Sequence, residues 1–319
     1  MLFNHCKPYL LALALCAGLS LTGCYSEEAL TPTPIEDELL FTYPQGSDTW
    51  DREIQTLQEK FGTYITYREI TQGILNRAWV NQDAMRVLVG DQIPDEQMPA
   101  YMDFITRQFL DFVDVRYAHY LPRYIFLLDG LHLEGPDISR VTYQFGKFDG
   151  VDFWAVSFNE KQFDAQGNLK LTVKEERTRR CLLNYNLICK AIDDGEIEAP
   201  VGFTTGIDYN TEIQYLRPAA SDYYLTRGFV DNVDPGFSEG ETNRFSVGVM
   251  RAKNNDLLAY VRKILYSTPS EFEAQYADYD LVLKRRQLIV DHFLDLGWDL
   301  NAISNGPSSV TPLNPKLFE

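Results

Sequence analysis

The sequence predicts one α+β domain, and two observations lead to this fold class. Segments with helical spacing alternate with short strand-like runs in the first half of the chain, whereas the part from residue 255 onward shows helical spacing alone. No internal repeat and no deep break in composition divides the body of the chain. A single domain over residues 49–304 is therefore the simplest interpretation.

The first half opens with a helix and a strand. Apolar residues at helical spacing predict a helix over residues 49–61, and the β-rich run at 64–67 predicts the first strand. The same spacing predicts a helix over residues 99–115. The apolar run at 124–128, which follows Pro122, predicts a buried strand.

Two further strands and a long helix follow. Strands are expected at residues 141–145 and 153–158, and the Asp-Ala-Gln-Gly-Asn sequence at 164–168 predicts a turn. A helical stretch from 171 to 192 follows this turn. The remaining periodicity predicts the C-terminal helices, over residues 255–266, 270–276 and 279–296.

The N-terminus resembles a bacterial lipoprotein signal peptide, which we assign to residues 1–23. Lys7 opens a short cationic region, residues 9–21 are almost wholly apolar, and the run ends in Leu-Thr-Gly-Cys at Cys24. The resemblance implies that Cys24 becomes the mature N-terminus and carries diacylglycerol and palmitate-type chains. Two or three acyl chains anchor a protein durably. An uncleaved helix or an ordinary signal peptide is the alternative.

The segment after Cys24 predicts a tether and a location. Residues 24–48 hold three prolines among acidic and hydroxyl residues, so we expect a flexible tether. The acidic residues after Cys24 resemble the surface-export signal of Bacteroidetes lipoproteins, which implies the outer membrane and its external face, with the periplasmic face as the alternative. A proline-containing tail is expected at residues 305–319.

Charge and cysteine spacing exclude two further interpretations. The chain holds 29 basic against 46 acidic residues, a formal net charge of −17, which opposes sequence-independent binding of nucleic acid. Cys181 and Cys189 remain as thiols after processing, in an exported protein where disulfides are permitted. On one helix they would lie about 12 Å apart, beyond the ~7 Å reach of a disulfide. We therefore expect two buried thiols.

The histidines and glycines of the chain form no recognisable catalytic motif. The four histidines are far apart in the sequence: His5, His119, His132 and His292. No His-x-His, His-Glu-x-x-His or paired Cys/His spacing is present. A glycine-rich phosphate loop and a Gly-x-Ser-x-Gly elbow are also absent from the sequence.

Three segments resemble a known family: residues 61–67, residues 170–183 and residues 255–303. They are similar to the substrate-import-associated zinc metallohydrolases, a family of Bacteroidetes lipoproteins. Its members sit beside TonB-dependent outer-membrane importers and carry a zinc-peptidase helix with a His-His-Glu-x-x-His core. The resemblance implies a zincin-like metallopeptidase fold, with a small mixed sheet ahead of a helical C-terminal half. It also implies two partners, the importer and its substrate-binding lipoprotein.

This chain departs from the family at the metal-binding positions. Glu176 keeps the position of the general base, but Glu175 stands where the first ligand histidine belongs and Arg179 where the second belongs. Two imidazoles four residues apart both reach a zinc ion, whereas a guanidinium has donors only and stays protonated. Downstream, Asn255 and Ala259 replace two acidic residues of the family. The resemblance therefore implies a vestigial site without metal ligands.

Ion pairs are the expected replacement for the metal site. Glu175 and Arg179 are four residues apart with the acid first, which is the favourable order on a helix. Glu176 and Arg180 repeat this spacing. A solvated charged face is the alternative. In the downstream segment, Asp256 alone keeps the family's acidic residue.

A non-catalytic accessory to a nutrient importer, binding glycan or peptide, is the function that these residues favour. No cofactor is expected, although the family would use zinc. The first alternative is an active zinc-dependent metallohydrolase or peptidase with non-standard ligands, such as Glu175, Glu176 and one of the distant histidines. A structural scaffold of an import complex is the second. Dense tyrosine groups at 117–124 and 223–224 suit either exposed binding platforms or a packed core, and strand preference favours the core.

Overall fold

The computed structural model describes residues 39–77, 87–135, 138–142, 148–150, 152–211, 217–230 and 253–307. Cys24, the signal peptide and the first part of the tether lie outside the described residues, as does the end of the predicted tail. The chain divides after Leu40, and the unit that begins at Phe41 carries the helices and strands of the described residues. No helix in these ranges has both the length and the apolar content that crossing a bilayer requires.

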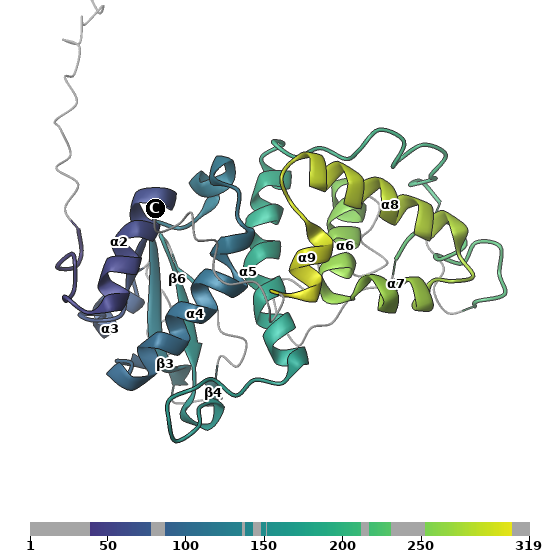
Figure 1. Cartoon of the computed structure of the whole chain (residues 1–319). Helices are drawn as coiled ribbons and strands as arrows, with labels where there is room; N and C mark the ends of the chain where they lie inside the picture. Colours follow the sequence, from purple (N-terminus) through teal and green to yellow (C-terminus); the bar gives the residue numbers. More distant parts are fainter. Residues whose placement is uncertain are drawn as a thin grey trace, which may run out of the picture. The chain divides into compact units, whose positions relative to one another are not determined.

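Six strands in the described ranges form one mixed sheet (Figure 1). They are β1 (Tyr64–Thr66), β2 (Val87–Asp91), β3 (Tyr124–Gly135), β4 (Ile138–Thr142), β5 (Phe148–Asp149) and β6 (Phe153–Phe158). The first half of β3 pairs in parallel with β1 and β6, and its second half pairs antiparallel with β2 and β4. β5 extends the sheet beyond β6. The apolar run of β3 is buried because neighbours flank it on both sides.

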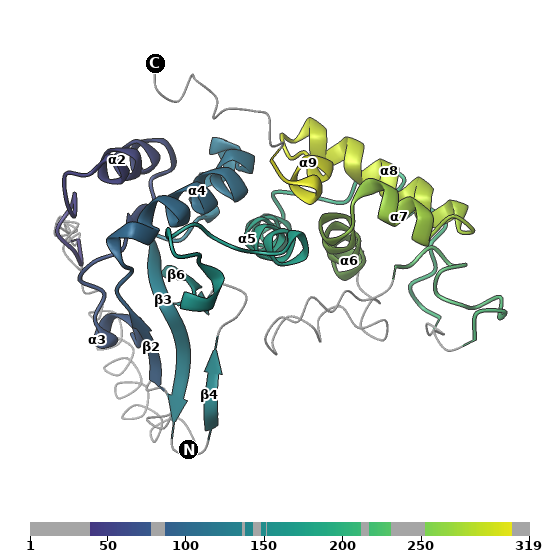
Figure 2. The same cartoon turned by 60° about the horizontal axis from the view of Figure 1, so that its bottom comes forward.

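Eight helices accompany the sheet in the described part of the chain. They are α2 (Thr49–Phe61), α3 (Gln72–Leu75), α4 (Met98–Gln108), α5 (Val173–Asp193), α6 (Lys253–Tyr266), α7 (Pro269–Gln275), α8 (Asp280–Asp295) and α9 (Leu300–Asn305). Both views show α5 between the sheet and the C-terminal helices α6 to α9 (Figures 1 and 2). The helix that carries the predicted vestigial site is therefore the junction of the two halves.

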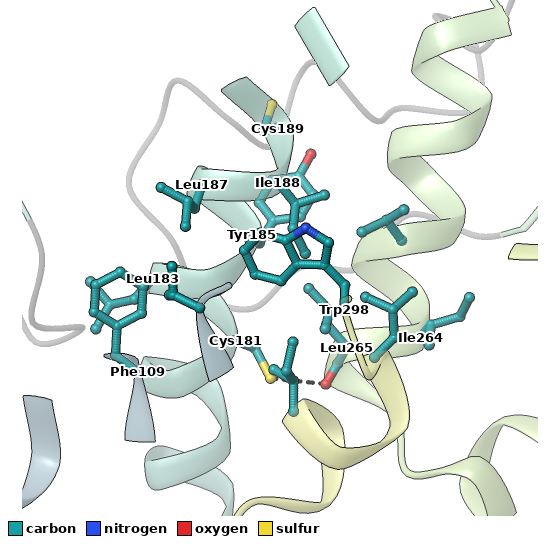
Figure 3. Packing of buried hydrophobic residues seen from close by; sticks show 14 of the residues in the cluster. Phe109, Cys181, Leu183, Tyr185, Leu187, Ile188, Cys189, Ile264, Leu265 and Trp298 are labelled. Carbon is teal, nitrogen blue, oxygen red and sulfur yellow. Dashed lines mark hydrogen bonds between the residues drawn. The ribbon is translucent and has the colours of Figure 1, made fainter. Parts of the chain in front are cut away.

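One hydrophobic core continues from the sheet side to the helical side through α5. Leu183 and Tyr185 on α5 are almost fully buried, as are Phe109 on one side and Leu265 and Trp298 on the other (Figure 3). Full burial of an apolar side chain contributes about 1.5–3 kcal/mol. Packing against both halves therefore stabilises α5 more than its helix propensity does.

Most of the predicted elements are confirmed. α2 has the predicted bounds, and the strands predicted at 64–67, 124–128 and 153–158 correspond to β1, β3 and β6. The long predicted helix is α5, and the predicted C-terminal helices are α6, α7 and α8. Of the strand predicted at 141–145, the structure describes the start, as the end of β4. The coarse prediction, a small mixed sheet followed by helices, agrees with the structure.

The helix predicted over residues 99–115 is wrong beyond Gln108. α4 ends there, and two 3₁₀ turns follow, η2 (Leu110–Phe112) and η3 (Val115–Tyr120). A 3₁₀ turn also returns a side chain to the same face after three residues, so apolar spacing does not distinguish it from an α-helix.

The predicted tether is too long at its C-terminal end. Phe41 is buried and packs edge-on against the rings of Tyr124 and Phe126, with centroid distances of 5.7 and 5.4 Å. Asp48 and Asp51 then form the capping box that begins α2. Prolines and acidic residues suggested a tether, but the aromatic contacts hold residues 41–48 on the folded unit.

Cys181 and Cys189 are buried thiols on α5 rather than a disulfide, as predicted. The Sγ of Cys181 donates to the carbonyl oxygen of Leu265 at 2.9 Å. Burial raises the pKa of the Cys181 thiol to about 12. A thiol that stays protonated is a poor nucleophile, so Cys181 contributes packing rather than chemistry.

Candidate functional site

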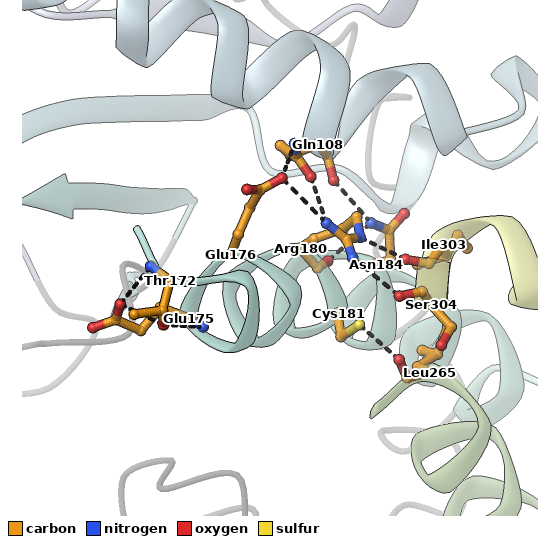
Figure 4. A network of polar contacts seen from close by, with 10 residues as sticks. All are labelled: Gln108, Thr172, Glu175, Glu176, Arg180, Cys181, Asn184, Leu265, Ile303 and Ser304. Carbon is orange, nitrogen blue, oxygen red and sulfur yellow. Dashed lines mark hydrogen bonds and ion pairs between the residues drawn. The ribbon is translucent and has the colours of Figure 1, made fainter. Parts of the chain in front are cut away.

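The first residue of the predicted vestigial site, Glu175, caps the start of α5. Thr172 is the N-cap residue, and its Oγ1 accepts a hydrogen bond from the Glu175 amide at 3.2 Å. In return, the Glu175 carboxylate accepts from the amide and the hydroxyl of Thr172, at 2.8 and 2.7 Å. These bonds from Thr172 hold the pKa of Glu175 below its usual range. The two residues form a capping box (Figure 4).

The predicted close ion pair between Glu175 and Arg179 is wrong, because both side chains bind other groups. The carboxylate turns back to Thr172, whereas Arg179 donates to groups at the end of β6. The two charges still attract each other at longer range, which adds a little to the lowering of the Glu175 pKa by Thr172 and offsets a small part of the lowering of the Arg179 pKa by burial. A capping box satisfies backbone donors that the helix leaves open, while an exposed i, i+4 pair contributes only a few tenths of a kcal/mol.

Arg179, which the sequence predicts at the position of the second ligand histidine, is buried and anchors α5 to the sheet. Only 2% of the residue is exposed. Its Nη1 donates to the carbonyl oxygen of Ser157 at 2.8 Å, and its Nη2 donates to Oε1 of Gln162 at 3.3 Å. The guanidinium carbon also lies 4.5 Å from the ring centroid of Phe158. Burial lowers the pKa of Arg179 to about 10, so the group remains a cation at neutral pH.

Glu176, which the sequence predicts at the position of the general base, joins a polar network with Gln108 and Arg180 (Figure 4). Its Oε1 accepts a short hydrogen bond from Nε2 of Gln108 and lies 3.7 Å from Nη1 of Arg180. Nη1 of Arg180 also donates to Oε1 of Gln108 at 2.6 Å. The predicted pair of Glu176 with Arg180 is thus confirmed, with Gln108 bound to both partners.

Arg180 connects α5 to the C-terminal end of α9. The residue is 3% exposed, and burial lowers its pKa. Its Nε and Nη2 donate to the carbonyl oxygens of Ile303 and Ser304, at 2.5 and 3.0 Å. Gly306 packs against the guanidinium of Arg180 and has a φ of +84°. A Cβ at this position would lie 2.8 Å from the guanidinium carbon. Ordered packing therefore extends past residue 304, where the sequence placed the end of the domain.

The predicted site positions on α6 also contribute to packing. Ala259 on α6 is buried and offers no donor atom, and Asn255 is partly buried one turn before it. Asp256 has no exposed surface and forms a short ion pair with Nη2 of Arg285 on α8. The hydroxyl of Tyr209 donates to the same carboxylate oxygen at 2.7 Å. Asp256 therefore holds the helical half together instead of facing α5.

Each of the three histidines beyond the signal peptide lies within hydrogen-bond distance of an oxygen atom outside residues 172–180. Nε2 of His119 lies 3.1 Å from a carboxylate oxygen of Glu196, and Nε2 of His292 lies 3.0 Å from the carbonyl oxygen of Glu198. Nδ1 of His132 lies 2.7 Å from the carbonyl oxygen of Gly130. The described residues contain no group of three or more histidine, cysteine, aspartate or glutamate side chains that could hold a metal ion.

The residues at the vestigial positions do not fit a zinc ion. Zinc requires neutral imidazoles, thiolates or carboxylates in a tetrahedral arrangement. The positions offer instead a carboxylate used in a cap, a carboxylate bound by Gln108, a buried guanidinium and a methyl group. No catalytic step through a metal can be derived from this arrangement.

Sequence reasoning missed the neutral partners of the two arginines. Gln108, Ser157 and Gln162 accept from Arg179 or Arg180, although they lie at least 17 residues away in the chain. A buried polar residue on the apolar face of α4 was the available signal for Gln108. The tyrosine groups are buried, with Tyr117 at 4% and Tyr223 at 8% exposure, so the core interpretation is confirmed for them.

Comparisons with known proteins add a structural resemblance. The chain matches no protein-family model and no curated protein sequence. Among solved structures it is similar to the crystal structure of a protein described as a "putative zinc-binding metallo-peptidase" from Bacteroides caccae ATCC 43185. The TM-score is 0.43 at 10% sequence identity, and the match covers 81% of this chain and 92% of that chain.

Proposed function

We propose that this protein is a lipid-anchored outer-membrane accessory to a nutrient importer, with a zinc-peptidase-like fold in which arginine-mediated packing has replaced the metal site. The observation that carries the proposal is the position of Arg179. A residue that the motif assigns to a zinc ligand is a cation, 2% exposed, and bound to Ser157 and Gln162.

The buried charge opposes zinc for two reasons. A guanidinium has no lone pair to offer, and its positive charge repels a divalent cation in a region of low dielectric constant. Removing Arg179 from the site would also leave the carbonyl oxygen of Ser157 without this donor. Without a metal-bound water, Glu176 lacks the nucleophile that a zinc-peptidase general base activates.

The accessory role rests on the sequence at the N-terminus and on the family resemblance. Cys24 with the preceding Leu-Thr-Gly supports a lipid anchor, and the acidic residues that follow support export to the cell surface. The resemblance supports a TonB-dependent importer and its substrate-binding lipoprotein as partners, and glycan or peptide as ligand.

Zinc content and peptidase activity test the non-catalytic assignment. We expect the purified wild-type chain to carry substoichiometric zinc by elemental analysis and to leave casein uncleaved. The double variant Glu175→His/Arg179→His serves as the comparison, and we expect it also to lack tight zinc, because Asn255 and Ala259 still offer no acidic ligand. About one tightly bound zinc per wild-type chain would favour the active hydrolase instead.

The location is tested separately. In fractionated cells, Cys24→Ala should leave the membrane pellet, and in intact cells a protease should remove the wild-type protein if it faces outward. A Cys24→Ala protein that stays in the pellet would contradict the lipid anchor. Co-purification of the importer from cross-linked membranes tests the partner, and its absence would favour a different role at the same location.

A further inference from the structure

β1 and β2 lie along one edge of the sheet. Tyr124 of β3 pairs with both β1 and β6, and Asp129 of β3 pairs with both β2 and β6. β1 and β2 therefore share the side of β3 opposite to β6. In the described ranges no further strand pairs with either of them. An edge of this kind presents backbone N–H and C=O groups that can pair with a strand of another chain.

A side-chain amide occupies the outer groups of β2. Oδ1 of Asn76 accepts from the Leu88 amide at 2.7 Å, and Nδ2 of Asn76 donates to the Leu88 carbonyl oxygen at 2.8 Å. Nδ2 of Asn76 also donates to the carbonyl oxygen of Gln72, the first residue of α3, at 2.8 Å. Asn76 thus binds Leu88 through one acceptor and one donor, as a residue of a neighbouring antiparallel strand would.

A second side-chain amide, that of Gln45, binds the two residues that follow β1 directly. Oε1 of Gln45 accepts from the amides of Tyr67 and Arg68, at 2.8 and 3.1 Å. Nε2 of Gln45 donates to the carbonyl oxygen of Arg68 at 2.8 Å. Gln45 belongs to residues 41–48, which the aromatic packing of Phe41 holds on the folded unit. Both amides are partly buried.

We propose that Asn76 and Gln45 close this edge against strand addition, and so prevent a second copy of the chain from pairing along β1 and β2. A side-chain amide has the same donor and acceptor as a peptide group but cannot continue as a strand. It therefore pairs with the backbone groups of the edge strand without presenting unpaired backbone groups to a further strand. The sealed edge would be of particular use to a protein concentrated on a membrane surface.

The oligomeric state of edge variants tests the proposal. The chain from residue 25 onward, which retains the whole described fold and lacks the acylated cysteine, is compared with Asn76→Ala and with Gln45→Ala/Asn76→Ala by light scattering over a range of concentrations. Gln287→Ala, at an exposed position on α8, is the matched control. We expect wild type and control to stay monomeric and the double variant to reach at least the mass of a dimer. Edge variants that stay monomeric with wild-type circular dichroism would overturn the proposal.

Hydrogen exchange on the wild-type chain keeps the proposal testable if the variants fail to fold. The amide protons of Leu88 and Tyr67 should exchange about as slowly as those inside β3, because each is bound by a side-chain amide. Exchange at the rate of exposed loop amides would show that the edge is open, and the proposal would then be wrong.

Discussion

Two buried arginines, one in each half of the described fold, are held in different ways. Arg179 at the start of α5 donates to a main-chain carbonyl and a side-chain amide oxygen, and burial lowers its pKa to about 10. Arg285 on α8 is paired with the buried carboxylate of Asp256. Burial opposes the charged form of Arg285, but the interactions with Tyr260 and Asp256 outweigh this effect, so the pKa of Arg285 is raised. Aromatic rings face both groups.

The difference shows what each arginine contributes. Arg179 donates to a carbonyl oxygen and an amide oxygen, and burial disfavours its charged form, so it is a buried cation at the position that the sequence predicts for a former metal ligand. A full counter-charge compensates Arg285, which therefore acts as a structural ion pair between α6 and α8. The helical half is accordingly the more sensitive to loss of one partner.

The largest expected effect is at Asp256. Asp256→Ala leaves Arg285 buried without its counter-charge, which should lower the free energy of unfolding by about 3–5 kcal/mol in urea titration. Asp291→Ala on the exposed face of α8 is the control, with an expected change within about 0.5 kcal/mol. A loss below about 1 kcal/mol at Asp256 would contradict the comparison. Asp256→Asn/Arg285→Met should lose less than the two single replacements combined.

A smaller effect is expected at Arg179. Arg179→Met keeps much of the apolar volume but removes the donors to Ser157 and Gln162, so we expect a loss of about 1–3 kcal/mol in unfolding free energy. Arg179→Lys keeps the charge, but an ammonium group cannot donate to Ser157 and Gln162 with the planar geometry of a guanidinium. Its unfolding free energy should therefore lie between those of wild type and Arg179→Met. Arg107→Met, at an exposed pair on α4, is the control. Equal losses at Arg179 and Asp256 would remove the distinction between the two arginines.

The sequence predicted the helices and strands better than it predicted the partners of charged residues. Helical spacing is local, so α2 and α5 could be recognised from their own residues. The spacing also predicted the pair of Glu176 with Arg180, but the carbonyl partners of Arg180 at the end of α9 are 123 and 124 residues away, and no local pattern points to them. The predicted pair of Glu175 with Arg179 was wrong for a local reason. The sequence contains both the i, i+4 spacing to Arg179 and the Thr-x-x-Glu pattern of a capping box with Thr172, and the capping box is what forms.

The next effect concerns the contact of Gly306 with Arg180. Gly306→Ala introduces a side chain at a φ of +84° and against the guanidinium, and we expect it to lower stability by about 1–3 kcal/mol. Gly195→Ala is a matched control, because Gly195 has a φ of +79° with no atom near its added Cβ. The difference between the two variants, measured by urea unfolding, isolates the contact with Arg180. Equal losses would mean that backbone conformation alone explains the effect.

The smallest effect is expected at the cap of α5, where it separates Glu175 from the buried arginines. Thr172→Ala should cost about 1 kcal/mol of stability through the lost cap. The pKa of Glu175 is lowered in the folded chain, so its charged form contributes stability above the unfolded-state pKa of about 4.3. That contribution is lost as the pH falls through the folded-state pKa.

The stability difference between wild type and Glu175→Gln should therefore be largest at neutral pH and shrink below about pH 4. Glu273→Gln, at an exposed position on α7, controls for the general loss of a carboxylate. Urea unfolding at pH 7 and at about pH 3 measures both differences. A difference for Glu175→Gln that does not change with pH would mean that the carboxylate charge does not stabilise the cap. The hydroxyl of Thr172 alone would then stabilise the start of the helix, and neither the cap nor the attraction to Arg179 would depend on the charge of Glu175.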